Sequence, residues 1–127
     1  MRLTEFTGTW RQEIPEMRGE LGKTDIVLCE HKEDRLSGTI RRLLPESERF
    51  KRWSFEARIR KGLVFGTFWP SDEDKNPKNY GTLHLNMISD TYLEGFLVEL
   101  FCTDHEGEHR FTGEITHVPT RWIRNQG

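Results

Sequence analysis

The chain has 127 residues, of which 34% are hydrophobic and 31% are charged, and its formal net charge is −2. This length fits one domain over residues 1–127, and four Trp, eight Phe and two Tyr are too many aromatic residues for a disordered chain. The first residues lack an apolar stretch of signal-peptide length, and Glu99 interrupts the longest apolar run. We therefore expect a cytoplasmic protein without a transmembrane segment, tethered to a membrane only if helices lie upstream of this sequence.

Charge is spread unevenly along the chain. Residues 35–61 hold nine Lys or Arg and three Glu, a net charge of +6, which leaves −8 on the remainder. Two explanations stay open: the cations solvate two outward strand faces, or they form a patch that attracts phosphate groups. The net negative charge of the whole chain argues against binding to DNA or RNA.

Apolar residues recur at every second position, which is typical of strands, and few windows sustain a helical period. The short segments Lys61-Gly62 and Ser89–Thr91 fit hairpin loops, so consecutive strands should be antiparallel neighbours. Longer connections are expected at Pro15–Lys23, with one helical turn, and at Ser71–Asn79, as a loop at the mouth of a barrel. In chain order, the predicted strands are Glu5–Gln12, Thr24–His31, Arg35–Leu43, Arg52–Arg60, Leu63–Trp69, Tyr80–Ile88, Tyr92–Cys102 and His109–Val118.

An apolar-x-Gly-x-apolar pattern recurs in five of these strands. Residues two apart in a strand share a face, so each glycine should lie with its apolar neighbours on the inward side. Recurrent glycine indicates sharp bends of a sheet, which favours a barrel over an open sandwich. The expected fold is all-β: a small eight-stranded antiparallel up-and-down barrel, filled by side chains or holding one small ligand. The pattern is centred on Gly8, Gly38, Gly66, Gly95 and Gly113.

Gly8-Thr9-Trp10 resembles the G-x-W signature of the lipocalin and wider calycin superfamily, and Asp90-Thr91-Tyr92 resembles its second motif. This resemblance implies an arginine near the chain end that packs over the signature tryptophan, a role for Arg121 or Arg124. Secreted lipocalins carry a signal peptide and usually a disulfide, and this sequence shows neither.

An intracellular barrel of this kind is also similar to the SMODS-associating β-strand-rich effector domain of bacterial CBASS antiphage effectors. That resemblance implies a barrel that binds a cyclic di- or oligonucleotide second messenger in antiviral defence and couples binding to assembly or effector activation. In those proteins a pair of membrane helices usually precedes the barrel, and the present sequence does not include them.

Polar residues on the predicted inward face are candidates for ligand binding. Each follows an inward apolar residue toward a strand end, where a charge needs water, a partner or a polar ligand. Arg42 could pair with Glu99, or it could bind the phosphate of a cyclic nucleotide or another small anion. Trp10 and Trp53 could stack on bases or belong to the core. The predicted ligand-binding residues are Trp10, Gln12, Arg42, Trp53, Glu99 and His117.

Catalytic and metal-binding motifs are missing from the sequence. Cys29 and Cys102 have no CxxC spacing and no evident neighbouring histidine, so we expect no disulfide, zinc site or catalytic thiol. His105 and His109 straddle Gly107 in a predicted turn and cannot form a helical metal pair. The sequence therefore predicts no enzyme activity, no cofactor and no metal.

The segment Tyr92–Cys102 is apolar on both faces, and a second copy packed on its outer face is the simplest explanation. Three functions stay open: a sensor of a cyclic nucleotide, a calycin-type carrier or enzyme for a small apolar molecule, and a protein-interaction barrel with a filled interior. The basic segment and the inward Arg42 favour the sensor.

Overall fold

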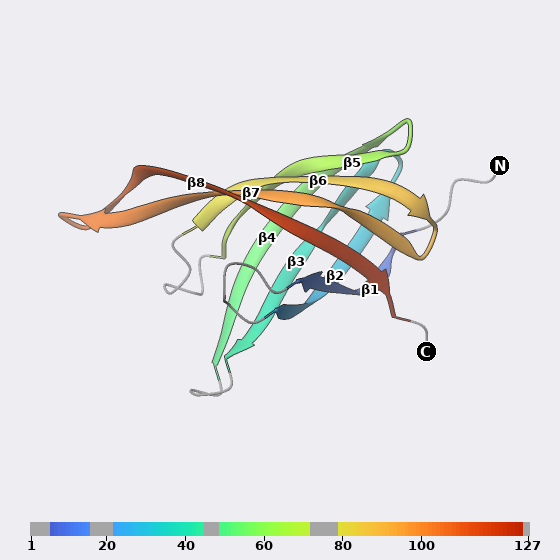
Figure 1. The fold of residues 1–127 in the computed structure, drawn as a ribbon, viewed down its shortest axis with the longest axis horizontal. Helices are drawn as coiled ribbons and strands as arrows, with labels where there is room; N and C mark the ends of the chain where they lie inside the picture. Colours follow the sequence, from blue (N-terminus) through green and yellow to red (C-terminus); the bar gives the residue numbers. More distant parts are fainter. Residues whose placement is uncertain (1–5, 16–21, 45–48, 72–78, 126–127) are drawn as a thin grey trace.

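The computed structural model describes residues 6–15, 22–44, 49–71 and 79–125, and these form a closed barrel of eight antiparallel strands (Figure 1). Each strand pairs with the next in the chain, and β1 also pairs with β8 to close the barrel. The predicted all-β, eight-stranded up-and-down barrel is confirmed. The strands are β1 (Gly8–Ile14), β2 (Lys23–Lys32), β3 (Arg35–Leu44), β4 (Arg49–Arg60), β5 (Leu63–Pro70), β6 (Asn79–Ser89), β7 (Tyr92–His105) and β8 (Glu108–Arg124).

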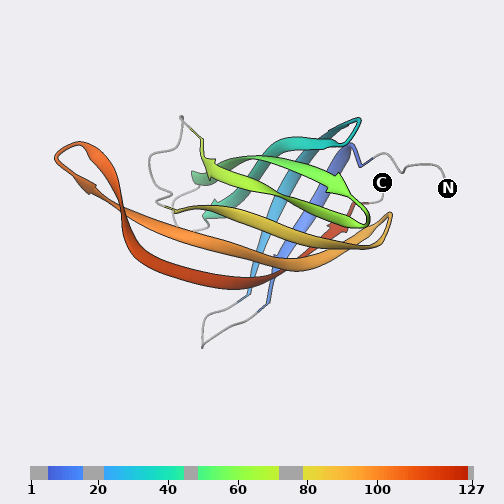
Figure 2. The same ribbon diagram turned by 90° about the horizontal axis from the view of Figure 1, so that it is seen from above.

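The two ends of the barrel differ (Figures 1 and 2). One end carries the tight turns from β2 to β3, β4 to β5 and β6 to β7. In the second of these, Lys61 and Gly62 have φ values of 49° and 82°, as a two-residue type I′ turn requires. The other end, here called the mouth, carries the connections from β1 to β2, β3 to β4 and β5 to β6. The helical turn expected within 15–23 and most of the loop expected within 71–79 lie outside the described residues.

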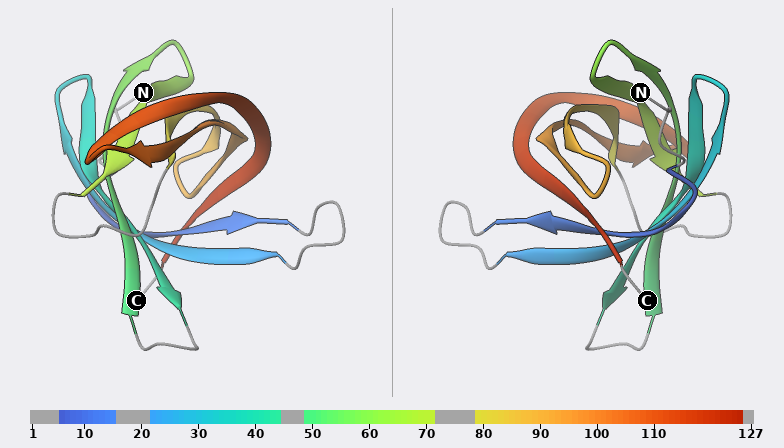
Figure 3. Two further views of the ribbon diagram at one scale, coloured as in Figure 1. Left: turned by 90° about the vertical axis from the view of Figure 1, so that its left-hand side faces the viewer. Right: turned by 90° about the vertical axis from the view of Figure 1, so that its right-hand side faces the viewer.

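Hairpins splay apart at the mouth. Viewed along the barrel, the β1–β2 and β3–β4 hairpins point in different directions (Figure 3). The β7–β8 hairpin, orange to red in Figures 1 and 2, projects beyond the rest of the barrel. Polar side chains near this end can therefore reach solvent from several strands.

Close contact between strands explains the recurrent glycines. A Cβ atom added to Gly66 on β5 would lie 2.0 Å from the carbonyl oxygen of Glu56 and 2.5 Å from the Cα of Ala57, both on β4. Gly95 on β7 would meet the carbonyl oxygen of His84 at 1.9 Å. The neighbouring backbones can approach this closely only without a side chain, which lets the sheet bend into a small barrel.

The pattern centred on Gly113 does not place its apolar neighbours on the inward face as predicted. Apolar residues that flank Gly8, Gly38, Gly66 and Gly95 are buried, whereas Phe111 and Ile115 are 64% and 61% exposed. The pairing of β7 with β8 shifts register between Leu100 and Cys102, and Gly113 has φ of +92°. All residues from 108 to 115 are exposed, in the part of the hairpin that projects beyond the barrel, so the inward assignment of Phe111 and Ile115 is wrong.

Strand β8 continues six residues beyond its predicted end at Val118, to Arg124. The chain remains extended through Pro119, which opposes Phe96 of β7 and lies outside the stretch of β8 that pairs with β1. Only Trp10–Glu13 of β1 pair with β8, and the same register would oppose Ile14 to Thr120 and then Pro15 to Pro119. Since neither proline has an N–H to donate, the β1–β8 ladder cannot continue through that position.

Large side chains from all eight strands meet in the barrel interior. Trp122 on β8 packs against Trp10 on β1 and Phe55 on β4, with ring centroids 6.4 Å and 5.4 Å apart. These three side chains are at most 1% exposed. The remaining strands contribute Val27, Ile40, Val64, Phe68, Leu83, Leu85, Leu93 and Leu97. In the described part of the chain, no helix is long and apolar enough to span a membrane.

Candidate functional site

Four of the six predicted site residues line one small pocket at the mouth: Gln12, Arg42, Trp53 and Glu99. They come from β1, β3, β4 and β7. The first three lie near the mouth end of their strands, and Glu99 lies in the middle of β7, opposite Gly81 near the start of β6. The pocket measures about 20 Å³, which accommodates roughly one water molecule. Its other walls are Ile40, Phe68, Asn79 and Leu97.

A chain of hydrogen bonds connects this mouth to the core. The indole Nε1 of Trp122 donates to Gln12 Oε1 over 2.8 Å, and Gln12 Nε2 donates to Asp25 Oδ2, also over 2.8 Å. Arg42 donates twice to the same carboxylate, from Nε to Oδ1 at 2.7 Å and from Nη2 to Oδ2 at 2.9 Å. The Asp25 side chain is 0% exposed and that of Arg42 is 17% exposed. The carboxylate therefore fixes the arginine in one orientation, facing the mouth.

Arg42 also lies over an aromatic ring. Its guanidinium carbon is 5.4 Å from the ring centroid of Trp53, a cation–π distance. The indole Nε1 of Trp53 donates to Asn79 Oδ1 over 3.1 Å. The acidic partner of Arg42 is Asp25 on β2, whereas one interpretation of the sequence suggested Glu99. Two of the five arginine N–H groups are engaged by Asp25, and the others can donate to an anion at the mouth.

Cations face one another across β3 and β4 at the mouth. The register opposes Arg42 to Lys51 and, one rung away, Arg41 to Arg52. Like charges directly opposite on neighbouring strands repel. Asp25 neutralises Arg42, whereas no ion pair joins Lys51 to a described residue. An anion bound at the mouth would pair with Lys51.

Trp10 lies away from the mouth pocket. It is 0% exposed, and its indole Nε1 donates to the carbonyl oxygen of Phe6 over 2.9 Å. The guanidinium carbon of Arg124 lies 5.4 Å from its ring centroid, so the arginine implied by the lipocalin resemblance is present at Arg124. Arg121 instead forms an ion pair with Glu13 at 3.4 Å. Trp10 is therefore a core residue, and Arg124 packs over its ring.

The inward position predicted for His117 is wrong. His117 is exposed, and its ring lies 6.1 Å from that of Phe96, which is 41% exposed on the outer face of β7. Val118, Thr120 and Trp122 are the buried residues of this strand, so alternation places His117 on the outer face; the pattern around Gly113, which indicated the opposite parity, lies in the exposed part of the hairpin. Phe96 also stacks on His84 with ring centroids 4.8 Å apart. The outer face of β7 is therefore partly covered by imidazole rings from both neighbours.

The sequence did not lead us to predict two residues of the mouth, Asp25 and Asn79. Asp25 alternates with the apolar Val27 and Cys29, and this alternation would have placed it inward. The glycine pattern did not extend to β2, so the inward face of that strand was not assigned. Asn79 is the first residue of β6, and its position two residues before Gly81 puts it on the inward face.

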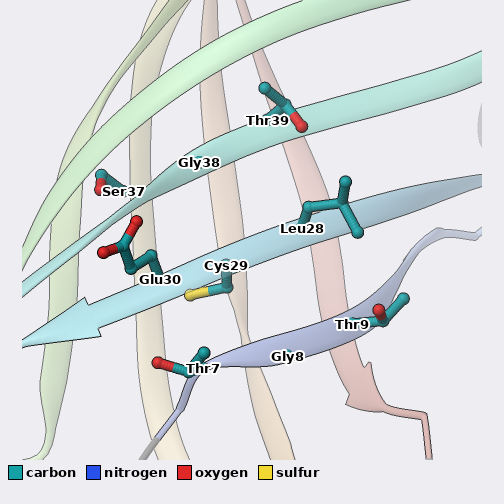
Figure 4. Close-up of a pocket in the computed structure, with 9 residues that line it drawn as sticks. All are labelled: Thr7, Gly8, Thr9, Leu28, Cys29, Glu30, Ser37, Gly38 and Thr39. Carbon is teal, nitrogen blue, oxygen red and sulfur yellow. The ribbon is translucent and has the colours of Figure 1, made fainter.

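Two wider hollows lie on the outer surface. One, of about 420 Å³, crosses β1, β2 and β3 where Gly8 and Gly38 lack side chains (Figure 4). Its polar groups are four hydroxyls and one carboxylate, Glu30, and its lining includes no cation. The other, of about 480 Å³, lies over β3, β4 and β5, and Asp34 already pairs with its Arg58 at 3.1 Å. Neither combines an aromatic ring with a fixed, partly buried arginine as the mouth does.

Comparisons with models of protein families, with curated proteins and with solved structures find no match to this chain.

Proposed function

We propose that this barrel is a non-enzymatic sensing module that binds a cyclic di- or oligonucleotide and couples binding to assembly or to activation of an effector. The observation that carries the proposal is Arg42, which Asp25 orients and which lies 5.4 Å from the Trp53 ring. An oriented arginine suits a phosphate, and an adjacent indole suits a base. Lys51, opposite Arg42 in register, adds a second cation. The resemblance to the barrel of CBASS effectors supports the same class of ligand.

In this proposal the ligand lies across the mouth and not inside the barrel. A pocket of about 20 Å³ admits a single phosphate oxygen at most, whereas sites for whole small molecules occupy roughly 300–1,000 Å³. The ligand would place a phosphate against Arg42 and Lys51 and a base near Trp53. The module would act in the cytoplasm, and its assembly would use the outer face of β7 over Tyr92–Cys102.

A second candidate function is a protein-interaction barrel with a filled interior. The small volume of the mouth pocket favours it, because such a barrel needs no ligand cavity. The same volume weighs against a carrier for an apolar molecule, which would need an open cavity lined by Leu, Phe and Trp.

Thermal unfolding distinguishes these functions. The protein is melted with cyclic di- and trinucleotides, linear dinucleotides and fatty acids, since a ligand that binds only the folded state raises Tm. A ligand at 100 times its Kd adds about 2.7 kcal/mol, which is several degrees for a domain of this size. We expect a selective shift with a cyclic nucleotide. A shift with fatty acids alone would contradict the proposal in favour of a carrier, and no shift would favour the protein-interaction barrel.

Charge reversal at the mouth tests the location of the site. Lys51→Glu should abolish the shift in Tm caused by the cyclic nucleotide while leaving the fold intact, because Lys51 is part-exposed. Arg60→Glu is the matched control: it makes the same change of charge on the same strand, at the opposite end of the barrel. Equal losses of binding in both variants would indicate a nonspecific effect of net charge and contradict a site at the mouth.

A further inference from the structure

A thiol, an imidazole and a carboxylate meet at the base of the β7–β8 hairpin, outside the proposed ligand site. The Sγ atom of Cys102 lies 3.6 Å from Nδ1 of His109, and Nε2 of the same ring lies 3.2 Å from Oδ1 of Asp104. The sequence reasoning found no histidine beside either cysteine, and this expectation is wrong for Cys102. The pairing of β7 with β8 opposes Asp104 to His109 and Cys102 to Phe111, which brings the three groups together.

The local fold keeps the thiol covered but close to solvent. Cys102 is 5% exposed, whereas the side chains of His109 and Asp104 are 41% and 57% exposed. The Tyr80 ring packs edge-on against Phe111, with centroids 5.7 Å apart, and its hydroxyl lies 3.4 Å from His109 Nδ1. The β-bulge immediately before Cys102 sets this arrangement, and bulges often re-aim side chains at functional sites.

We propose that Cys102 is a reactive thiol and a site of reversible oxidation by hydroperoxides. A nucleophile within reach of a base that a third group orients is the arrangement that activates side-chain nucleophiles. The Asp104 carboxylate, 3.2 Å from Nε2, favours the tautomer that keeps the ring proton on Nε2, and in this tautomer Nδ1 of His109 can accept the proton of the thiol.

The reaction balances without a further component. The sulfur attacks one oxygen of hydrogen peroxide, a sulfur–oxygen bond forms and the oxygen–oxygen bond breaks. The thiol proton passes through His109 to the departing hydroxide, which leaves as water. Sulfur is oxidised to a sulfenic acid, and the peroxide is reduced. A second thiol can reduce the product, so the modification is reversible.

Alkylation of the two cysteines by iodoacetamide under native conditions tests the reactivity. Cys29 is an internal control, since it is 6% exposed and thus as well covered as Cys102. We expect Cys102 to react faster than Cys29 by mass spectrometry of the labelled peptides. His109→Asn should slow the alkylation of Cys102 by roughly tenfold at pH 7, because a thiol without a neighbouring base is only a few per cent thiolate at that pH.

Further variants separate activation from simple exposure. Tyr80→Phe removes the hydroxyl that competes for Nδ1, so Cys102 should react as fast as before or faster. A dimedone adduct should form at Cys102 after treatment with hydrogen peroxide, and His109→Asn should lower its yield. If the reagent reached Cys102 only through local opening of the fold, both Tyr80→Phe and His109→Asn would raise the rate of Cys102 alkylation. Equal rates for Cys29 and Cys102, or an unchanged rate in His109→Asn, would overturn the proposal.

Discussion

Asp25 is the most constrained charge of the mouth, because its carboxylate is fully buried and receives hydrogen bonds from Gln12 and twice from Arg42. Among the described residues, no buried side-chain polar atom lacks a partner. A satisfied buried network tolerates little change, since removal of one member leaves the others desolvated and unpaired. The network that orients Arg42 toward a ligand thus also contributes to holding β1, β2, β3 and β8 together.

Arg42→Met tests this energetic role. The substitution keeps most of the stem and removes the charge, which leaves the Asp25 carboxylate buried with Gln12 alone. We expect the free energy of unfolding to fall by about 3–5 kcal/mol, as measured by urea denaturation. Arg58→Met is the control, because Arg58 pairs with Asp34 where both side chains are about half exposed (48% and 59%). The control substitution should lower the free energy of unfolding by less than about 1 kcal/mol. Similar losses of unfolding free energy in both variants would show that the buried pair of Asp25 with Arg42 contributes no more to stability than the exposed pair.

Glycine was the marker that assigned polar residues to the inward face, so this assignment was possible only on strands that contain it. Glycines marked this face on β3 and β7, so Arg42 and Glu99 were placed correctly at the mouth. Strand β2 has no glycine, and Asp25 was overlooked although it is the partner that orients Arg42. A buried ion pair between neighbouring strands depends on register, which alternation in one strand does not supply.

At the level of elements, the bends at the glycines decide whether the sheet can close. Gly66→Ala would place a methyl group 2.0 Å from the Glu56 carbonyl oxygen, and backbone cannot yield as a flexible side chain can. We expect a loss of about 3 kcal/mol or more in the free energy of unfolding, at the upper end of overpacking costs. Thr67→Ala, at the adjacent exposed position, should change stability by less than about 1 kcal/mol. A tolerated Gly66→Ala would mean that β4 and β5 can separate at this point.

Strand order, strand number and most strand positions followed from alternation and turn residues, but β8 did not. The strand was predicted to end at Val118, just before Pro119, whereas it passes through this proline and contributes Trp122 to the core. The pattern around Gly113 lies beside a bulge in the exposed part of the hairpin, so its parity did not mark the inward face, and His117 is on the outer face. Proline on an edge and a bulge within a hairpin both depend on neighbouring strands, so a single strand pattern does not reveal them.

At the level of the whole molecule, the barrel combines a filled interior with a polar mouth. Trp10 and Trp122 occupy the interior, Trp53 lies at the mouth, and Trp69 lies half-buried on β5. A ligand that rests on the mouth would alter the surroundings of one tryptophan and leave the interior pair nearly unchanged. The hydrogen-bonded chain from Trp122 through Gln12 to Asp25 would then hold the scaffold rigid under the ligand.

The most direct test is a nuclear magnetic resonance titration of ¹⁵N-labelled protein with the cyclic dinucleotide or trinucleotide that raises Tm, following the four indole N–H signals. A ligand on the mouth should shift the Trp53 signal most, because its indole N–H lies beside Asn79 and Arg42. The signals of Trp10, Trp69 and Trp122 should move little. A saturating ligand that leaves Trp53 unchanged while shifting Trp69 or the interior pair would contradict a ligand site at the mouth.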